Sequence, residues 1–247
     1  SETTRLPRAP FTTSTLQQDA FRRLGFSTKQ TMVLAQQLYE GVNLLGKGST
    51  GLITYMRTDS LNLSEQSLTD AKDFIKKEFG NPYTLASPRR FKTKSKGAQE
   101  AHEAIRPTDP FRTPQSLEAL LDRRQFRLYD LIWRRFMATQ MPAATFDSTA
   151  VDIAAAPSSQ LTTPSYTFRA NGQVMKFDGF LKVYPTKFTE NELPELEPEE
   201  ELDLQKLKPL QHFTEPLPRY TEASLVKTLE QNGIGRPSTY APTISTI

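Results

Sequence analysis

Residues 51–60 carry a phenol, a guanidinium and a carboxylate at alternating positions, Tyr55, Arg57 and Asp59. In an extended chain alternate side chains point to the same face, so these groups would lie side by side, next to Ile53. A tyrosine with an arginine two residues later can act as a nucleophile beside a group that stabilises negative charge. An ordinary half-buried strand has the same composition, because tyrosine and threonine favour strands. The spacing alone therefore leaves both interpretations open.

A second pair of groups suited to phosphate lies further along the chain, His102 and Arg106. Residues 98–105 are expected to form a short helix that stops before Pro107, and side chains four apart on a helix are neighbours. A histidine and an arginine on one helix face can clamp a phosphate, and a basic stretch precedes them. Its members are Arg89, Arg90, Lys92, Lys94 and Lys96. The alternative is a histidine bonded to Glu103 or to a backbone carbonyl.

Residues 233–240 (GIGRPSTY) form a glycine-containing turn into a helix start. Ser238 or Thr239 would cap this helix and leave free backbone N–H groups pointing outward. Helix N-termini attract anions, and Arg236 adds a full positive charge. The alternative is a capped helix with a solvated arginine.

Arginines alternate with aromatic residues between positions 123 and 135. Positive charge next to stacking faces suits single-stranded nucleic acid. An amphipathic helix with an arginine outer face has the same pattern, and we favour it. The residues are Arg123, Arg124, Phe126, Arg127, Tyr129, Trp133, Arg134 and Arg135.

The elements that must position these groups are helical first and β-rich later. Capping residues, apolar spacing and terminal glycines predict helices that start at Ser14 or Thr15, at Ser27 or Thr28, and at Ser64. The first two contain inward-facing apolar residues up to Leu24 and Tyr39. Residues 116–141 are expected to be helical in two pieces.

The period changes after residue 142. Strands are predicted over residues 146–153, 166–170, 174–176, 181–184 and 204–207, and residues 190–203 are predicted to be an acidic loop. Asn171 and Gly172 predict a tight hairpin turn. A helix should follow from Thr221 to Gly233, and another should begin near Ser238. The fold class is therefore α+β, with a helical segment of about 16–141 set between parts of a β-rich region.

The composition excludes several kinds of chemistry. The chain has no cysteine, which removes disulfides, thiolate nucleophiles and cysteine-bound zinc, and with two histidines a metal site is not expected. No segment has the length or apolarity of a membrane span and no signal peptide opens the chain, so we expect a cytoplasmic protein with no membrane partner. The chain begins without methionine and stops inside a helical pattern, so we expect a fragment.

Several long motifs, in order, resemble the bacterial type IA DNA topoisomerases. They are residues 53–60 (ITYMRTDS), 100–107 (EAHEAIRP), 221–226 (TEASLV) and 233–240 (GIGRPSTY). Residues 10–18 (PFTTSTLQQ) and 177–179 (FDG) fit the same family. The resemblance covers essentially the whole chain.

The resemblance implies that Tyr55 attacks a phosphodiester of single-stranded DNA and holds a 5′-phosphotyrosine while another strand passes, which relaxes negative supercoils. It implies that Arg57 contacts the scissile phosphate, with Asp59, His102 and Arg106 close to the phosphate or DNA. It also implies nucleotide binding by Arg236, Ser238 and Thr239. Because phosphotyrosine conserves the phosphodiester energy, resealing needs no ATP.

The resemblance also implies a domain organisation. Residues 1–15 and 142–217 would form a β-rich arch and hinge, residues 16–141 the helical domain that carries the tyrosine, and residues 218–247 the start of a helical DNA-binding domain. Family members bind Mg²⁺ through a TOPRIM domain and often carry C-terminal zinc modules, and nothing here resembles either.

We therefore expect a monomeric, nucleoid-associated partner of single-stranded DNA and of its own TOPRIM domain, inactive in relaxation by itself and without a cofactor. The alternatives are a stand-alone single-stranded DNA-binding or hinge module, or the topoisomerase part of a reverse gyrase. Tyrosine recombinases form the opposite, 3′ linkage, and their motif order does not fit.

Overall fold

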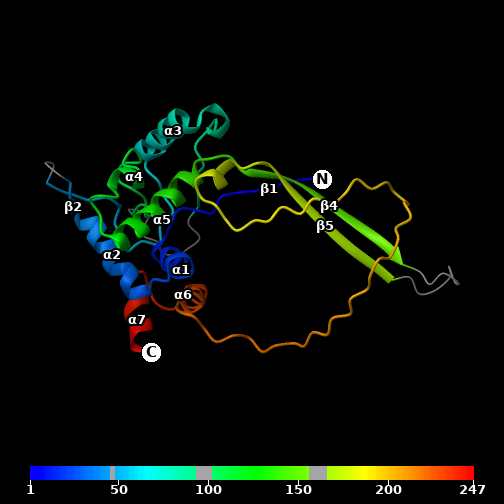
Figure 1. Cartoon of the computed structure of the whole chain (residues 1–247). Coiled ribbons are helices and arrows are strands. Elements are labelled where there is room, and N and C mark those ends of the chain that lie inside the picture. The colour runs from blue at the N-terminus through cyan, green and yellow to red at the C-terminus, as the bar shows by residue number, and fades with distance from the viewer. Residues whose placement is uncertain (45–47, 93–101, 156–165) are drawn as a thin grey trace. The chain divides into compact units, whose positions relative to one another are not determined.

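The computed structural model describes residues 1–44, 48–92, 102–155 and 166–247 (Figure 1). The chain forms two compact units. Unit 1 consists of residues 1–4, 145–177 and 187–219, and unit 2 of residues 5–144, 178–186 and 220–247. Unit 1 is built on a β-sheet and unit 2 on helices, which confirms the predicted α+β class. Lys94 and Lys96 of the predicted basic stretch lie outside the described residues.

The sheet of unit 1 has the strand order β1-β4-β5. These strands are β1 (Glu2–Arg5), β4 (Ala144–Ala155) and β5 (Tyr166–Phe177). β4 and β5 pair antiparallel along their whole length, from Thr145 opposite Phe177 to Ala155 opposite Tyr166. The predicted strand at 146–153 is confirmed.

The predicted hairpin at Asn171 and Gly172 is wrong. Both residues lie inside β5, opposite Ala150 and Thr149, so the two short strands predicted here are one. A Cβ on Gly172 would lie 2.8 Å from the Leu193 side chain and 2.9 Å from the Asn191 carbonyl oxygen. The glycine therefore allows close approach of another segment, which, besides a turn, is a reason for glycine to occur in such a sequence.

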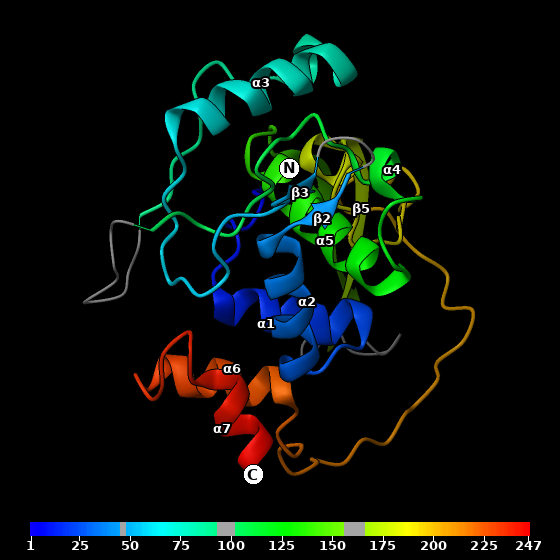
Figure 2. The same ribbon diagram turned by 90° about the vertical axis from the view of Figure 1, so that its left-hand side faces the viewer.

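Unit 2 contains seven α-helices within the described residues (Figures 1 and 2). They are α1 (Thr13–Leu24), α2 (Thr28–Glu40), α3 (Glu65–Phe79), α4 (Pro114–Leu117), α5 (Arg123–Thr139), α6 (Glu222–Gln231) and α7 (Tyr240–Thr246). A small ribbon of β2 (Val42–Asn43) and β3 (Ser49–Thr50) and two 3₁₀ turns, η1 (Asn81–Tyr83) and η2 (Gly179–Lys182), complete it.

The helix ends follow the capping residues that the sequence contains. Ser27 and Ser64 accept bonds from backbone N–H groups in the first turns of α2 and α3, and Thr221 forms a capping box with Ser224 at α6. α1 starts slightly earlier than predicted, because Thr12 rather than Ser14 or Thr15 is its N-cap. The left-handed Gly25 ends α1 as expected.

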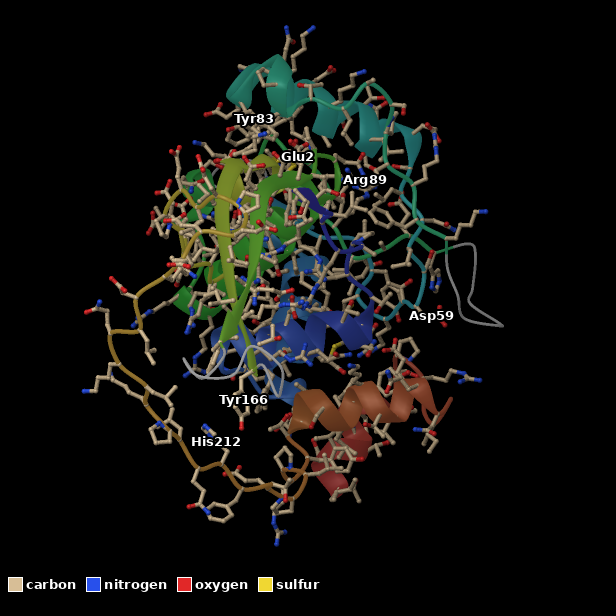
Figure 3. The ribbon with its side chains drawn as sticks, turned by 90° about the vertical axis from the view of Figure 1, so that its right-hand side faces the viewer. Glu2, Asp59, Tyr83, Arg89, Tyr166 and His212 are labelled. Atoms are coloured by element: carbon tan, nitrogen blue, oxygen red, sulfur yellow. The ribbon has the colours of Figure 1, made fainter. Side chains whose placement is uncertain are left out.

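The core of unit 2 surrounds α5, which packs against α1 and α2. Trp133 of α5 meets the Phe74 ring edge-on at 5.4 Å and donates its indole N–H to the Pro110 carbonyl at 2.9 Å. Arg89, labelled in Figure 3, donates to the Thr139 carbonyl at the end of α5. α6 packs against α1, and α7 packs against α2.

Three further predictions about elements are wrong. Residues 181–184 lie in and after the 3₁₀ turn η2 instead of a strand, and residues 204–207 form no strand. The described part of the predicted helix at 98–105, from His102 onward, is not helical, and Ile105 pairs with Phe11 in an isolated β-bridge. In the described ranges of the chain no helix combines the length and apolar character that crossing a membrane requires.

Candidate active site

The segment before Tyr55 is fixed by bonds to residues 104–108. The Thr54 N–H donates to the Arg106 carbonyl at 2.9 Å, and the Thr54 hydroxyl donates to the Ala104 carbonyl at 2.7 Å. The Thr108 N–H donates to the Leu52 carbonyl at 3.0 Å, and Leu52 is completely buried. This short antiparallel contact anchors the chain one residue before the tyrosine.

The segment after Tyr55 is fixed by one threonine at the start of α1. The Thr13 hydroxyl donates to the Met56 carbonyl at 2.7 Å, and the Thr13 N–H donates to the Thr58 carbonyl at 2.9 Å. The Thr58 N–H in turn donates to the Thr13 hydroxyl at 2.9 Å. Tyr55 therefore lies between two fixed stretches of backbone.

These bonds produce alternating exposure. Met56, Thr58 and Ser60 are buried, whereas Arg57 is exposed and Tyr55 and Asp59 are partly exposed. Tyr55, Arg57 and Asp59 thus alternate with buried residues, but Arg57 and Asp59 line different hollows. The prediction of a shared face is wrong for Ile53, which is buried and pairs with Pro107 in an isolated bridge, because residues 51–60 bend and do not form a regular strand.

Two aromatic rings contact the Tyr55 ring. His102 lies edge-on with ring centroids 5.6 Å apart, and Tyr39, at the end of α2, lies edge-on at 5.4 Å. The sequence pattern placed Tyr39 in the core, but 40% of it is exposed. The rings limit the directions that the phenol can take while its surface stays partly open.

Arg106 does not lie beside His102 on a helix. It is 9% exposed, and its guanidinium donates to the Glu103 carboxylate at 2.5 Å, to the Pro107 carbonyl at 2.9 Å and to the Ser64 hydroxyl at 3.3 Å. Glu103 also accepts the Ser64 N–H, so it is engaged here and not with the histidine. Arg106 therefore holds the backbone on which His102 is carried.

The turn before α7 meets the Tyr55 segment at two hollows of unit 2. Asp59 and Arg236 line one of about 900 Å³, and Arg57 and Ser238 line another of about 510 Å³. Pro237 lines both. Figure 3 shows Asp59 on the side of α1 and its neighbours that lies toward α6, which is drawn in orange. Groups that are remote in the sequence thus surround one short stretch.

The larger hollow carries more cations than carboxylates. Its charged residues are Arg8, Arg22, Lys92, Arg135, Arg236, Asp19, Asp59 and Glu230. Tyr240 also lines it, and burial raises the pKa of Tyr240, helped by Glu230 and Asp59 and opposed by Arg236. The Tyr240 phenol is therefore harder to deprotonate than an ordinary tyrosine.

Two N–H groups at the start of α7 are not free to bind an anion. The N–H groups of Thr239 and Tyr240 both donate to the Arg236 carbonyl, at 2.9 and 3.2 Å. The Thr239 hydroxyl accepts the Arg236 N–H at 2.8 Å, so it closes the turn and does not cap the helix. Arg236 and Ser238 remain exposed.

Metal binding was not expected from the sequence. Within the described ranges, no three histidine, cysteine, aspartate or glutamate side chains are grouped so that they could hold an ion.

Comparison with known proteins adds to this geometry. A family model described as DNA topoisomerase matches residues 1–247. The chain belongs to the bacterial type IA DNA topoisomerases. Full-length topoisomerase I from Thermotoga maritima is 40% identical to this topoisomerase segment, with a TM-score of 0.80. The match covers 100% of this chain and 38% of the Thermotoga chain, so the segment spans well under half of that protein.

Two residues of this candidate site were missed from the sequence. Thr13 was assigned to no chemistry, because its contacts with Met56 and Thr58 span more than forty residues and no local pattern indicates them. Tyr39 was assigned to the core from helical spacing alone. Its place as the penultimate residue of α2 was the available signal, since helix ends are often exposed.

Proposed function

We propose that this chain supplies the nucleophile of a type IA topoisomerase, and that the nucleophile is Tyr55. The observation that supports this most directly is the partly exposed phenol fixed on both sides by buried backbone bonds. Orientation of a reacting group before the substrate arrives lowers the entropic part of the barrier. A core tyrosine would have no need for such exposure.

In the proposed reaction the Tyr55 oxygen loses its proton and attacks a DNA phosphorus. A bond forms between the Tyr55 oxygen and the phosphorus, which stays on the 5′ end of one DNA piece. The bond between the phosphorus and the 3′ oxygen of the other piece breaks, and that oxygen takes a proton. Resealing reverses each step. One phosphodiester replaces another, so ATP hydrolysis is not required.

The other site residues would act on charge and position. Arg57 is exposed two residues after the nucleophile and would stabilise the phosphate oxygens in the transition state. His102 contacts the Tyr55 ring and would bind phosphate or accept the phenolic proton. Asp59, Arg236 and Ser238 would bind nucleotide at the two hollows. Thr239 and Arg106 would act by holding the turn and the His102 backbone.

Activity would need the rest of the parent protein, because the segment corresponds to 38% of the Thermotoga chain. Family resemblance points to a TOPRIM domain as the Mg²⁺-binding partner. Single-stranded DNA would be the substrate, and relaxation of negative supercoils the outcome.

Mixing this chain with a separately produced TOPRIM fragment, Mg²⁺ and labelled single-stranded DNA tests the proposal. We expect a covalent DNA adduct on this chain with the wild-type protein and none with Tyr55→Phe. Tyr220→Phe, an exposed tyrosine outside the site, is the matched control and should form the adduct. An adduct that persists in Tyr55→Phe would refute the assignment.

A further inference from the structure

The α2 helix lies between two hollows of unit 2. The hollow of about 510 Å³ is lined by residues of α2 and α7 and by Arg57. A second hollow, of about 720 Å³, separates α2 from the start of α5 and is lined by Arg123 and Arg124. Three residues spaced four apart line both hollows and form one row along the helix, called here the α2 ridge: Lys29, Val33 and Gln37.

The arginines of α5 divide into two groups. Arg127 donates to the Leu24 carbonyl, Arg134 pairs with Asp130 at 2.6 Å, and Arg135 is buried. The side chains of Arg123 and Arg124 are exposed and make no hydrogen bond or ion pair with any described residue. The predicted arginine outer face is therefore wrong for the buried Arg135, whereas Arg123 and Arg124 are solvated and available to a ligand.

The charge on this surface has one sign. Lys29 and Arg57 are also exposed without a side-chain partner among the described residues. Of the described residues that line the two hollows, Asp122 alone carries a carboxylate, and its Oδ1 accepts the N–H groups of Arg124 and Gln125 as the cap of α5. Three arginines thus face solvent on the two sides of a ridge that itself carries one exposed lysine.

We propose that the α2 ridge is a crossing point for the backbone of single-stranded DNA. Phosphates would meet Arg57 on one side of the ridge and Arg123 and Arg124 on the other, with Lys29 between them. Val33, 52% exposed, would contact a sugar or base. That the strand is the one cleaved at Tyr55 rests on the proposed function.

A single strand fits this surface better than a duplex. The cations lie on both sides of one α-helix, which is about 10–12 Å wide. A strand that contacts both sides must bend over that width, whereas duplex DNA has a persistence length of about 150 base pairs. A flexible strand can follow the ridge, because base-independent binding needs only charge and surfaces for stacking or packing.

A fluorophore on the ridge tests the location. The chain has no cysteine, so Val33→Cys gives a single labelling position. We expect the fluorescence of this label to change when an oligothymidine is added to the Tyr55→Phe chain. The same label at Lys77→Cys, on the exposed face of α3, should not respond.

Salt dependence tests the cations. Each phosphate contact on a single strand contributes about 0.7 to the slope of log K against log salt. Arg123→Gln with Arg124→Gln should therefore lower the slope by about 1.4. Lys76→Gln with Lys77→Gln changes the formal charge equally on α3 and should keep the wild-type slope.

The outcomes separate this inference from the proposed function. Every binding measurement uses Tyr55→Phe, so it does not depend on covalent chemistry, and failure of adduct formation would leave it unaffected. A silent Val33→Cys label, equal slopes for the two double variants, tighter binding of duplex than of single strand, or no binding at low salt would each overturn the inference.

Discussion

At the scale of single residues, the surroundings of Tyr55 combine rigidity with access. Its backbone is fixed by Thr54 and Thr13, and its ring is bordered by Tyr39 and His102. Aromatic pairs contribute about 0.5–1.5 kcal/mol beyond the area they bury. The Tyr39 contact is therefore large enough to affect how often the phenol points toward a substrate.

Tyr39→Leu should slow adduct formation by about 2- to 12-fold, which corresponds to that range of energy. Tyr39→Phe keeps the ring and should react at the wild-type rate. The measurement is the initial rate of covalent adduct formation with the TOPRIM fragment at saturating oligonucleotide. Equal rates for the two variants would show that the ring contact has no positioning role.

A second residue-scale feature is the buried group around Asp19. Its carboxylate accepts the Tyr184 hydroxyl at 2.9 Å and pairs with Arg135 at 3.3 Å. Burial raises the pKa of Tyr184 to about 12. An unfolded tyrosine ionises near pH 10, so the unfolded chain loses this proton first as the pH rises.

The free energy of unfolding should therefore fall as the pH rises from about 10 to about 12. Urea denaturation at several pH values in this range measures the effect. Tyr184→Phe should make the fall shallower, although other buried tyrosines such as Tyr129 keep part of it. Tyr166→Phe, an exposed residue of unit 1, should leave the slope unchanged.

At the scale of elements, α6 is attached to the Tyr55 region by two carboxylates. Glu230 accepts the Ser14 hydroxyl at 2.7 Å in the first turn of α1, and Glu222 accepts the Thr28 N–H at 2.6 Å at the start of α2. Helix N-termini favour negative charge. Both bonds therefore use the same electrostatic preference to hold one helix against two others.

Glu222→Gln combined with Glu230→Gln should loosen α6. Hydrogen bonds to charged groups contribute about 1.5–3 kcal/mol each, so we expect faster hydrogen exchange in α6 and α7 and little change in α3. Hydrogen exchange followed by mass spectrometry measures this. Glu78→Gln, on the exposed side of α3, is the control, and equal protection of α6 in both proteins would contradict the prediction.

Some elements could be predicted from the sequence and others could not, because some depend on local residues and others on distant contacts. Helix limits were predicted well where a local cap determines them, as at Ser27 and Ser64. His102 was misplaced on a helix because the N–H groups of Ala104 and Ile105 bond to remote carbonyls at Asn62 and Phe11. No pattern confined to residues 98–107 contains that information.

The candidate site shows the same division. The motif around Tyr55 is contiguous, so its nucleophile and arginine could be proposed from the sequence. Gly172 was misinterpreted because a turn and a close approach both favour glycine, and its contact with Leu193 decides between them. The remaining features of the candidate site depend on contacts between distant segments, which a local sequence pattern does not contain.

At the scale of the whole molecule, the chain passes several times between its two units, because each unit is made of three separate segments. The chain corresponds to 38% of the Thermotoga protein. We expect no relaxation of negatively supercoiled plasmid by this chain in the presence of Mg²⁺. Gel electrophoresis of plasmid topoisomers measures this, with the mixture that contains the TOPRIM fragment run alongside. Robust relaxation by the chain alone would show that the proposed nucleophile, Tyr55, needs no further domain.

The sheet of unit 1 joins the start of the chain to its middle. β1 lies next to β4, and the Thr3 and Ser148 hydroxyls are 2.9 Å apart across 145 positions of sequence. Ribosomes add about 5–20 residues per second, so Thr3 emerges roughly 7 to 30 s before its partner exists. The nascent β1 segment must remain soluble for that time, and its sequence, Glu-Thr-Thr-Arg, is polar throughout.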